Sequence, residues 1–331
     1  MHTSIVKKIF LFPTLLMVAS MACAVQLTAA TPTEIPATSL VVTVAPTQES
    51  AAVTSVPTAA VPTQVPAVTT SATAISTPVV PTQLPPTPQP TVSAGTTVTY
   101  RPLTLVIPPA VARGASGSDF SREDGNDAAE WQKTPGHLQV MLGDYYVLRG
   151  KTNQPQIYVY PAQAYVELVP GAFESIHRLD NILYGPGGPS LGADQLPAIP
   201  FFNARQVFTS SALLISFQNG SGVRFLTEYA QYPASANNQD LFYTFQGVTR
   251  DGAYYIVAIF PVSSPVLAET SEAGAPLPSR GIPYPYMANP QANMNAYYAS
   301  ITDLLNTQRP DSFTPSLNQL DALIQSMQIN P

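Results

Sequence analysis

Residues 212–231 read ALLISFQNGSGVRFLTEYAQ, and this stretch decides the fold class. An apolar arm ends at Gln218, the turn-forming residues 219–222 (NGSG) follow, and a second arm begins at Val223. Two β-prone arms joined by Asn and Gly are typical of a β-hairpin. The second arm alternates so that one face is apolar or aromatic and the other is largely polar. The stretch therefore predicts an antiparallel sheet.

A second hairpin is predicted further along the chain. Its arms are residues 241–249 and 253–262, and residues 250–252 (RDG) form the turn between them. The run Tyr254–Phe260 is apolar on both faces, which indicates a central strand that is covered on both sides. An earlier strand is expected at Gln156–Tyr160.

Three segments have the apolar spacing of amphipathic helices, namely residues 172–183, 296–305 and 317–327. Strands in a meander with helices packed on one or both faces form an α+β fold with an antiparallel sheet. The polar, Gly-rich segment 113–130 is expected to be a loose extension of this domain.

The N-terminus indicates export from the cytoplasm. Lys7 and Lys8 precede the apolar run 9–22, which is shorter than the roughly 18 residues of a membrane-spanning candidate. Cys23 follows directly, as in a bacterial lipoprotein signal, where the cysteine receives the lipid. An ordinary signal-peptide cleavage at the A-x-A site of residues 22–24 would remove the cysteine instead. We expect lipidation of Cys23. Lipidation and ordinary signal-peptide cleavage both stay open as alternatives.

A low-complexity tract separates this signal from the rest of the chain. It is rich in Pro, Thr, Ala and Val, and Glu34 and Glu49 are its only charged residues. Because proline fixes φ and removes hydrogen-bond donors, we expect an extended tether that is a bare spacer or carries glycans. The predicted domains are a signal (1–23), a disordered linker (24–98) and a folded domain (99–331).

Composition excludes several classes of site. Cys23 is the only cysteine, so the folded domain has neither disulfides nor thiol chemistry. A formal net charge of −6, with only two lysines after residue 100, argues against nucleic acid as a partner. The sequence has no nucleotide-binding or redox motif, and we expect no cofactor.

One pattern is similar to a catalytic motif. Residues 188–192 (GPSLG) match the G-x-S-x-G pattern, which needs a strand before the serine and a helix after it. Gly and Pro flank the pattern, and all three histidines (His2, His137 and His177) lie upstream of Ser190. We therefore expect a surface loop, with no catalytic serine.

Acidic residues provide two further candidates. The spacing of calcium-loop ligands is matched by Asp119, Ser121, Glu123 and Glu130. Such a loop requires glycine at its sixth position, where this chain has Asp124, so a solvated acidic loop without metal is expected. A glycosidase needs two converging carboxylates, and the candidates are Glu167, Glu228 and Asp240.

The best binding candidate is an aromatic loop. Residues 281–287 (GIPYPYM) carry Tyr284, Tyr286 and Met287 on a Pro-stiffened segment, and Trp131 is a further candidate. Tyrosines on a rigid loop contribute contact area at little entropic cost. The alternative is a connector whose tyrosines cover the core.

Three segments carry a family resemblance: the strand 156–160, residues 217–229 (FQNGSGVRFLTEY) and residues 242–261. They resemble a family of uncharacterised bacterial lipoproteins with Pro/Thr-rich tethers. This resemblance covers nearly all of residues 130–331 and implies an exported or anchored domain, without implying an activity. The antiparallel strands and late helices also resemble, more weakly, the PsbP/Mog1-like α/β/α sandwich, which implies an accessory or binding role at a membrane.

The sequence thus favours a non-enzymatic binding or accessory protein outside the cytoplasm. Its expected partners are the membrane, through the lipid, and an envelope protein or a glycan. An extracytoplasmic hydrolase of glycans and a structural envelope protein are the alternatives. A pocket with two carboxylates of raised pKa would favour the hydrolase, whereas a flat aromatic patch would favour the binding protein.

Overall fold

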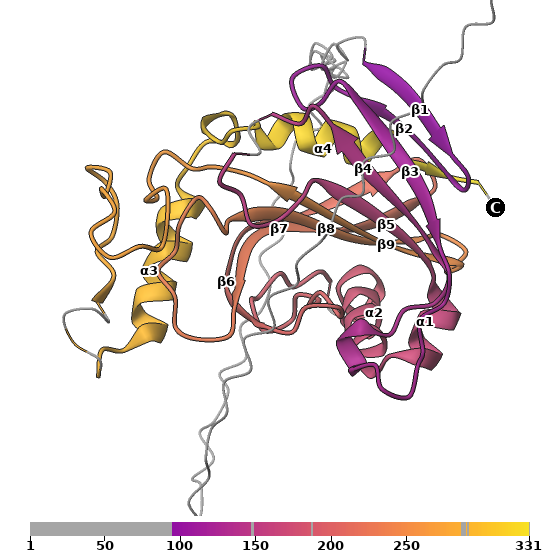
Figure 1. The fold of residues 1–331 in the computed structure, drawn as a ribbon, viewed down its shortest axis with the longest axis horizontal. Helices are drawn as coiled ribbons and strands as arrows, with labels where there is room; N and C mark the ends of the chain where they lie inside the picture. The colour runs from indigo at the N-terminus through magenta and orange to yellow at the C-terminus, as the bar shows by residue number, and fades with distance from the viewer. Residues whose placement is uncertain (1–94, 147–148, 187, 286–288, 290, 331) are drawn as a thin grey trace, which may run out of the picture. The chain divides into compact units, whose positions relative to one another are not determined.

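A seven-stranded antiparallel sheet forms the centre of the described structure (Figure 1). The computed structural model describes residues 95–330 except 147–148, 187, 286–288 and 290, so the expected signal, Cys23 and most of the expected linker lie outside the described residues. The predicted α+β fold with an antiparallel sheet is confirmed. In spatial order the strands are β3 (Gly114–Phe120), β4 (His137–Gly143), β5 (Gln156–Pro161), β9 (Tyr254–Pro261), β8 (Phe242–Thr249), β7 (Gly220–Ala230) and β6 (Arg205–Phe217).

Two meanders of consecutive strands meet in the middle of the sheet. β3, β4 and β5 form one, β6 to β9 form the other, and β5 pairs with β9 in antiparallel register. Along β9, alternate side chains enter the apolar cores on the two sides of the sheet, for example Ile256 on one side and Val257 on the other. The prediction of a central strand covered on both faces is therefore confirmed.

The first predicted hairpin is formed by β6 and β7, but its turn is shorter than expected. Phe217 pairs with Gly220, so Gln218 and Asn219 connect the strands, and both glycines of the NGSG sequence lie inside β7. A Cβ on Gly220 would lie 2.1 Å from the Phe217 ring, and one on Gly222 would lie 2.2 Å from the carbonyl oxygen of Gln246. The glycines are therefore needed for close packing within the sheet.

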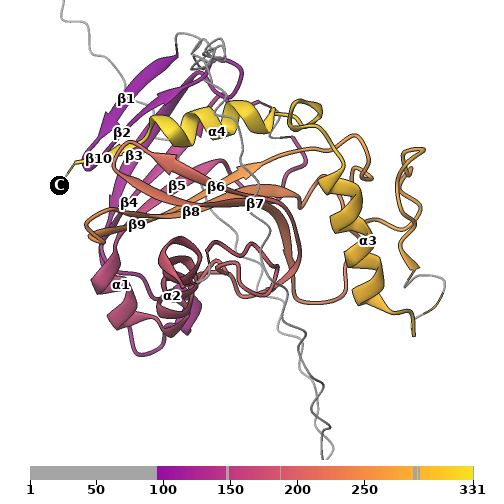
Figure 2. The same cartoon turned by 180° about the vertical axis from the view of Figure 1, so that it is seen from behind.

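Helices and a small second sheet cover the two faces. Helices α1 (Ala162–Leu168) and α2 (Pro170–Tyr184) pack on β5, β9, β8 and β7 from one side. Figures 1 and 2 show α4 and the small sheet on the opposite side. Those covering elements are α4 (Leu317–Ser326), β1 (Thr96–Tyr100), β2 (Leu103–Ile107) and β10 (Gln328–Ile329). Helix α3 (Met294–Asn306) packs against the edge strand β6.

Two expectations about the N-terminal part of the domain were wrong. The segment 113–130, expected to be loose, contains β3, which pairs with β4 over its whole length and is followed by the 3-10 turn η1 (Glu130–Gln132). Small polar residues are compatible with an exposed edge strand, so polarity alone did not exclude pairing. Residues 96–98, assigned to the linker, pair with β2 as part of β1, because β-branched Thr and Val favour strands.

Candidate functional site

Helix α2 supplies one wall of a surface groove. Pro170 occupies its first turn, where a missing N–H has no intrahelical partner to lose. Ala172, Leu179 and Ile182 pack into the core, which leaves the polar side of the helix to the solvent. Gly185 is the C-cap of the helix, and the position favours glycine because a Cβ there would lie 2.3 Å from the Asn181 carbonyl oxygen.

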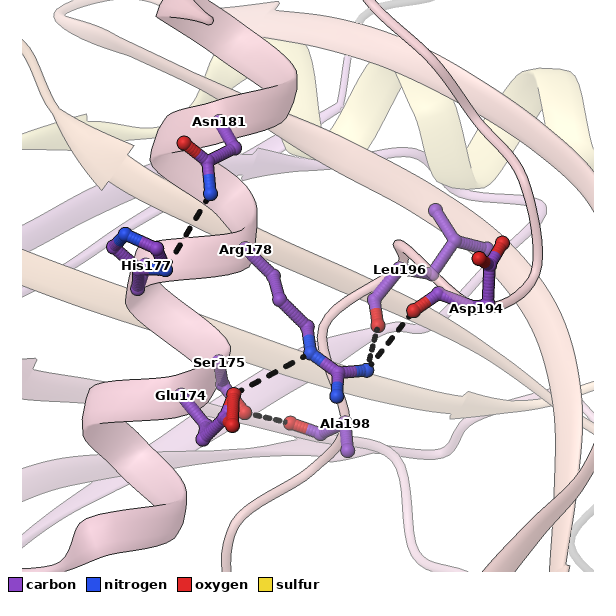
Figure 3. Close-up of polar contacts among 8 residues, drawn as sticks. All are labelled: Glu174, Ser175, His177, Arg178, Asn181, Asp194, Leu196 and Ala198. Atoms are coloured by element: carbon purple, nitrogen blue, oxygen red, sulfur yellow. Dashed lines mark hydrogen bonds and ion pairs between the residues drawn. The ribbon is translucent and has the colours of Figure 1, made fainter. Parts of the chain in front are cut away.

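The chain then returns along the helix as a Gly- and Pro-rich loop, residues 185–200. Its second half is fastened to the protein. Ser175 Oγ donates a hydrogen bond to the carbonyl oxygen of Ala198 at 2.5 Å (Figure 3), and Gln246 Nε2 donates to that of Pro197 at 2.9 Å. The first half remains exposed, so the loop forms a wall that faces α2 across open space.

The space between the helix and the loop is a groove with a cavity volume of about 530 Å³. We call it the α2 groove. Its lining includes Arg178, Asn181 and Ile182 from the helix and Ser190, Asp194 and Gln195 from the loop. Small-molecule sites typically occupy ~300–1,000 Å³ and contain a few convergent polar groups, and the α2 groove meets both criteria.

The guanidinium of Arg178, whose side chain is 41% exposed, is oriented on the helix wall by three long contacts (Figure 3). Its Nη1 donates to the carbonyl oxygens of Asp194 at 3.2 Å and Leu196 at 3.4 Å. Its Nε lies 3.6 Å from Glu174 Oε2. Within the described residues, no hydrogen bond engages Nη2. A guanidinium that is fixed at one end and has donors to spare suits a carboxylate or another oxyanion.

The loop wall adds oxygen atoms at one point. A Cβ placed on Gly192 would lie 2.9 Å from Asp194 Oδ1 and 3.9 Å from Ser190 Oγ, so both side chains converge beside this glycine. A hydroxyl donates and accepts, whereas an ionised carboxylate only accepts. Together with Arg178, the groove therefore offers donors and acceptors to a polar ligand.

Ser190 lacks the surroundings of a catalytic nucleophile. It lies in an exposed loop, as expected, with neither a strand directly before it nor a helix directly after it. In the described part of the chain, no hydrogen bond joins it to a histidine or a carboxylate, although a nucleophilic serine needs an adjacent base. His177 contacts Asn181, with Nδ1 to Nδ2 at 3.4 Å (Figure 3), and it is not among the residues that line the groove.

Comparison with known proteins places the chain in no family. No family model, curated protein or solved structure matches it. Among the helices of the described residues, none has the length and apolarity that crossing a membrane requires. The α2 groove is therefore identified from its geometry, and not from a known relative.

The four calcium-loop positions do not form a metal site. Asp119 belongs to β3, Glu123 pairs with Thr134 in an isolated bridge, and Glu130 begins η1, while Ser121 lies between the first two. Across the residues that the structure describes, no three His, Cys, Asp or Glu side chains are grouped closely enough to hold a metal ion. The spacing fails because β3 extends the chain at Asp119, whereas a calcium loop coils around its ion.

Two of the three glycosidase candidates come together, since Glu228 and Asp240 both accept hydrogen bonds from Asn237, and none of the three lines the α2 groove. Glu167 is exposed on α1 and accepts a hydrogen bond from Gln163 at 2.8 Å. Glu228 is only 2% exposed and accepts from the backbone N–H of Asn237 at 2.7 Å. Burial raises the pKa of Glu228 well above its ordinary value, and the charge of Asp240 adds to this shift. Because Glu228 is buried in the interior, its raised pKa reflects that burial, and its contact with Asn237 is a structural one.

The aromatic loop is partly outside the described residues, which exclude Tyr286 and Met287. The Tyr284 hydroxyl donates to the carbonyl oxygen of Pro233 at 2.7 Å, and its ring packs on the apolar core. Tyr284 thus packs on the core, as in the alternative interpretation, and it also lines a hollow of about 260 Å³. Trp131, in η1, is 41% exposed.

The residues of the α2 groove were not predicted from the sequence. Arg178, Asn181 and Asp194 stand in ordinary positions of a helix and a loop, and only the fold brings them together. The available signal was the Gly- and Pro-rich loop 185–200 directly after an amphipathic helix, since such loops often carry function.

Proposed function

We propose that this protein is a non-enzymatic binding or accessory protein that acts outside the cytoplasm. In this proposal residues 1–23 direct export, Cys23 carries the lipid that holds the chain at a membrane, and the Pro/Thr-rich segment separates the membrane from the folded domain. The sequence pattern of the N-terminus supports this arrangement, as does the resemblance to tethered bacterial lipoproteins.

The observation that carries the binding role is the orientation of the Arg178 guanidinium in the α2 groove. Two carbonyl oxygens and Glu174 orient it, and Nη2 has no hydrogen bond within the described residues. A donor that is already oriented loses little entropy on binding, and charge-assisted hydrogen bonds are stronger than neutral ones. The ligand class that fits is a small polar molecule with a carboxylate, whose other polar groups contact Ser190 and Asp194.

Thermal shift assays on the mature chain test this ligand class. Succinate, citrate and N-acetylglutamate serve as carboxylate probes, and succinamide is the neutral control. We expect a carboxylate to raise the melting temperature, succinamide to have no effect, and Arg178→Gln to abolish the shift. Arg280→Gln, at an exposed arginine outside the groove lining, should keep the shift. Absence of a shift with all three carboxylates, or an undiminished shift in Arg178→Gln, would contradict the proposal.

The anchoring is tested separately by mass spectrometry of the mature N-terminus. A chain that begins at Cys23 with a diacylglyceryl group supports the proposed anchor. A chain that begins at Val25 shows that an ordinary signal peptidase removed the cysteine, and it refutes the anchor without affecting the α2 groove.

A further inference from the structure

One face of the large sheet is open where β3 and β4 extend beyond the helices. Helices α1 and α2 pack on β5, β9, β8 and β7. On that same face the register sets Phe120 opposite His137, and Ser118 opposite Gln139. The row through Gln139 continues to Tyr158 on β5. We define the open face as Ser118, Phe120, His137, Gln139, Gln156 and Tyr158.

Side chains of the open face are accessible to a ligand. Phe120 is 47% exposed, which is unusual for a large apolar side chain whose neighbours form a regular sheet. Ser118 is also exposed, and the other four residues are half-buried. Accessibility is greatest at Phe120 and Ser118, whereas the Phe201 ring lies 4.9 Å from that of Tyr158 and partly covers it.

The aromatic rings of the open face are held in fixed positions. Phe120 stacks on His137 with ring centroids 5.4 Å apart and an angle of 13° between the planes. His137 in turn lies 4.7 Å from the ring of buried Tyr160 and 5.9 Å from that of Tyr158. Its Nδ1 lies 2.9 Å from the carbonyl oxygen of Pro135, which orients the imidazole. The open face therefore presents a preformed aromatic platform.

Polar groups beside the platform have unused hydrogen-bonding capacity. Gln139 Nε2 donates to Gln156 Oε1 at 2.7 Å, which fixes both amides. In the part of the chain that the structure describes, neither Gln139 Oε1 nor Ser118 Oγ has a hydrogen-bond partner. One acceptor and one hydroxyl thus lie next to the rings and can bind hydroxyl groups of a ligand.

The open face carries no formal charge. None of its six residues is acidic, lysine or arginine, although Asp119 lines a hollow beside Phe120 and His137, and burial lowers the pKa of His137, which favours the neutral imidazole. The chain as a whole has a formal net charge of −6, which disfavours acidic polymers through long-range repulsion. A neutral partner is therefore complementary to this surface.

We propose that the open face binds a neutral polysaccharide. The apolar C–H face of a sugar ring packs on Phe120, and its hydroxyl groups exchange hydrogen bonds with Gln139 and Ser118. The site is distinct from the α2 groove, so this proposal goes beyond the proposed function and does not depend on the ligand of the groove. The sequence left two classes of partner open, an envelope protein or a glycan. This proposal specifies the glycan.

Affinity electrophoresis of the mature chain tests the proposal, with native gels that contain laminarin, mannan or hydroxyethylcellulose. We expect at least one of these neutral polysaccharides to retard the protein, and Phe120→Ala to weaken the association at least tenfold. Phe173→Ala is a matched control, because Phe173 is 54% exposed and also stacks on a histidine, at 5.9 Å and 13°, but lies on α2. Its retardation should equal that of the wild type.

A second variant keeps the test decisive if Phe120→Ala fails to fold. Ser118→Glu places a charge on the face at an exposed position and should abolish retardation while the circular dichroism spectrum is unchanged. The proposal is overturned if no neutral polysaccharide retards the wild type, if Phe173→Ala loses as much retardation as Phe120→Ala, or if polygalacturonate retards the protein equally. It is also overturned if gel filtration shows a dimer that Phe120→Ala dissociates, since a second copy would then occupy the face.

Discussion

Arg224 of β7 and Asp321 of α4 form a two-point ion pair inside the protein, with Nε to Oδ1 at 3.2 Å and Nη2 to Oδ2 at 3.3 Å. The hydroxyl of Tyr243 donates to the same Oδ1 at 3.0 Å, and Arg224 Nη1 donates to the carbonyl oxygen of Ser211. Burial raises the pKa of Asp321, whereas the charge of Arg224 and the hydrogen bond from Tyr243 act to lower it. The pair joins the large sheet to the C-terminal helix.

Removal of one partner from this pair should destabilise the fold strongly. Asp321→Leu leaves the Arg224 guanidinium buried without a counter-charge, and we expect a loss of about 3–5 kcal/mol in the free energy of unfolding, measured in urea. The double variant Arg224→Met/Asp321→Leu removes both charges and should recover most of that loss. Asp303→Asn, on the exposed side of α3, should change stability by less than about 0.5 kcal/mol. A double variant no more stable than Asp321→Leu would show that the charge is not the cause.

The glycines of β7 provide a prediction about packing. Gly222→Ala forces a Cβ to within 2.2 Å of the Gln246 carbonyl oxygen and 2.6 Å of the Gly247 Cα, which are backbone atoms that cannot move independently. We expect it to cost about 3 kcal/mol or more, or to prevent folding. Gly114→Ala meets no atom within 4 Å and should be nearly neutral. The comparison is made by thermal unfolding, and similar melting temperatures for the two variants would contradict the packing role.

The strands and helices that bury many apolar residues were predictable from the sequence. The two-sided apolarity of β9 and the helical spacing in α2 reflect burial, which is recorded in the side chains themselves. The alternation in β7 did not predict an exposed face, because Arg224 and Glu228 on its polar face are buried as well. β3 was missed because an exposed edge strand is built from small polar residues, which are equally common in loops. The turn of the first hairpin was misplaced because glycine serves both turns and close packing.

The candidate sites were less predictable, because they depend on contacts between distant segments. Arg178 is oriented by the carbonyl groups of residues 194 and 196 only after the loop has folded back on α2. Most of the open face lies on β3 and β4, outside the strands on which α1 and α2 pack, and no local pattern records which strands a helix covers. Within its own stretch of sequence, Phe120 cannot be told from an ordinary apolar residue.

The buried carboxyl of Glu228 predicts a pH dependence of stability. Its pKa in the folded protein is raised well above 4.5 by burial, so the stability it contributes is present below pH 4.5 and is lost as the pH rises through the raised pKa. Glu228→Gln stays neutral and keeps an oxygen for the Asn237 N–H. We expect the variant to be more stable than the wild type at pH 8 and to approach it near pH 4.5, in urea unfolding across this range. A difference that does not vary with pH would contradict the raised pKa.

Lys151 joins three segments of the chain. It allows a test that complements the one on Glu228, because its side chain is a base and not an acid. Its Nζ donates to the carbonyl oxygens of Asn238 and Val262 and to Ser263 Oγ, the latter two at 2.7 Å. Lys151→Met leaves these acceptors without the donor, and we expect a loss of about 2–3 kcal/mol at pH 7. Lys133→Met is the control, since it removes the only other lysine after residue 100 and should have little effect.

The same lysine should make the difference depend on pH. Burial lowers its pKa from 10.5 to about 8, against the charges of Glu269, Glu228 and Asp240, which raise it. Between these two values the unfolded chain binds the proton and the folded chain does not, so the wild type gains stability relative to Lys151→Met as the pH rises from 8 to 10.5. Urea unfolding of both proteins at intervals across that window measures the gain. A constant or shrinking difference would mean that Lys151 keeps its proton in the fold, and that its three hydrogen bonds outweigh the cost of its burial.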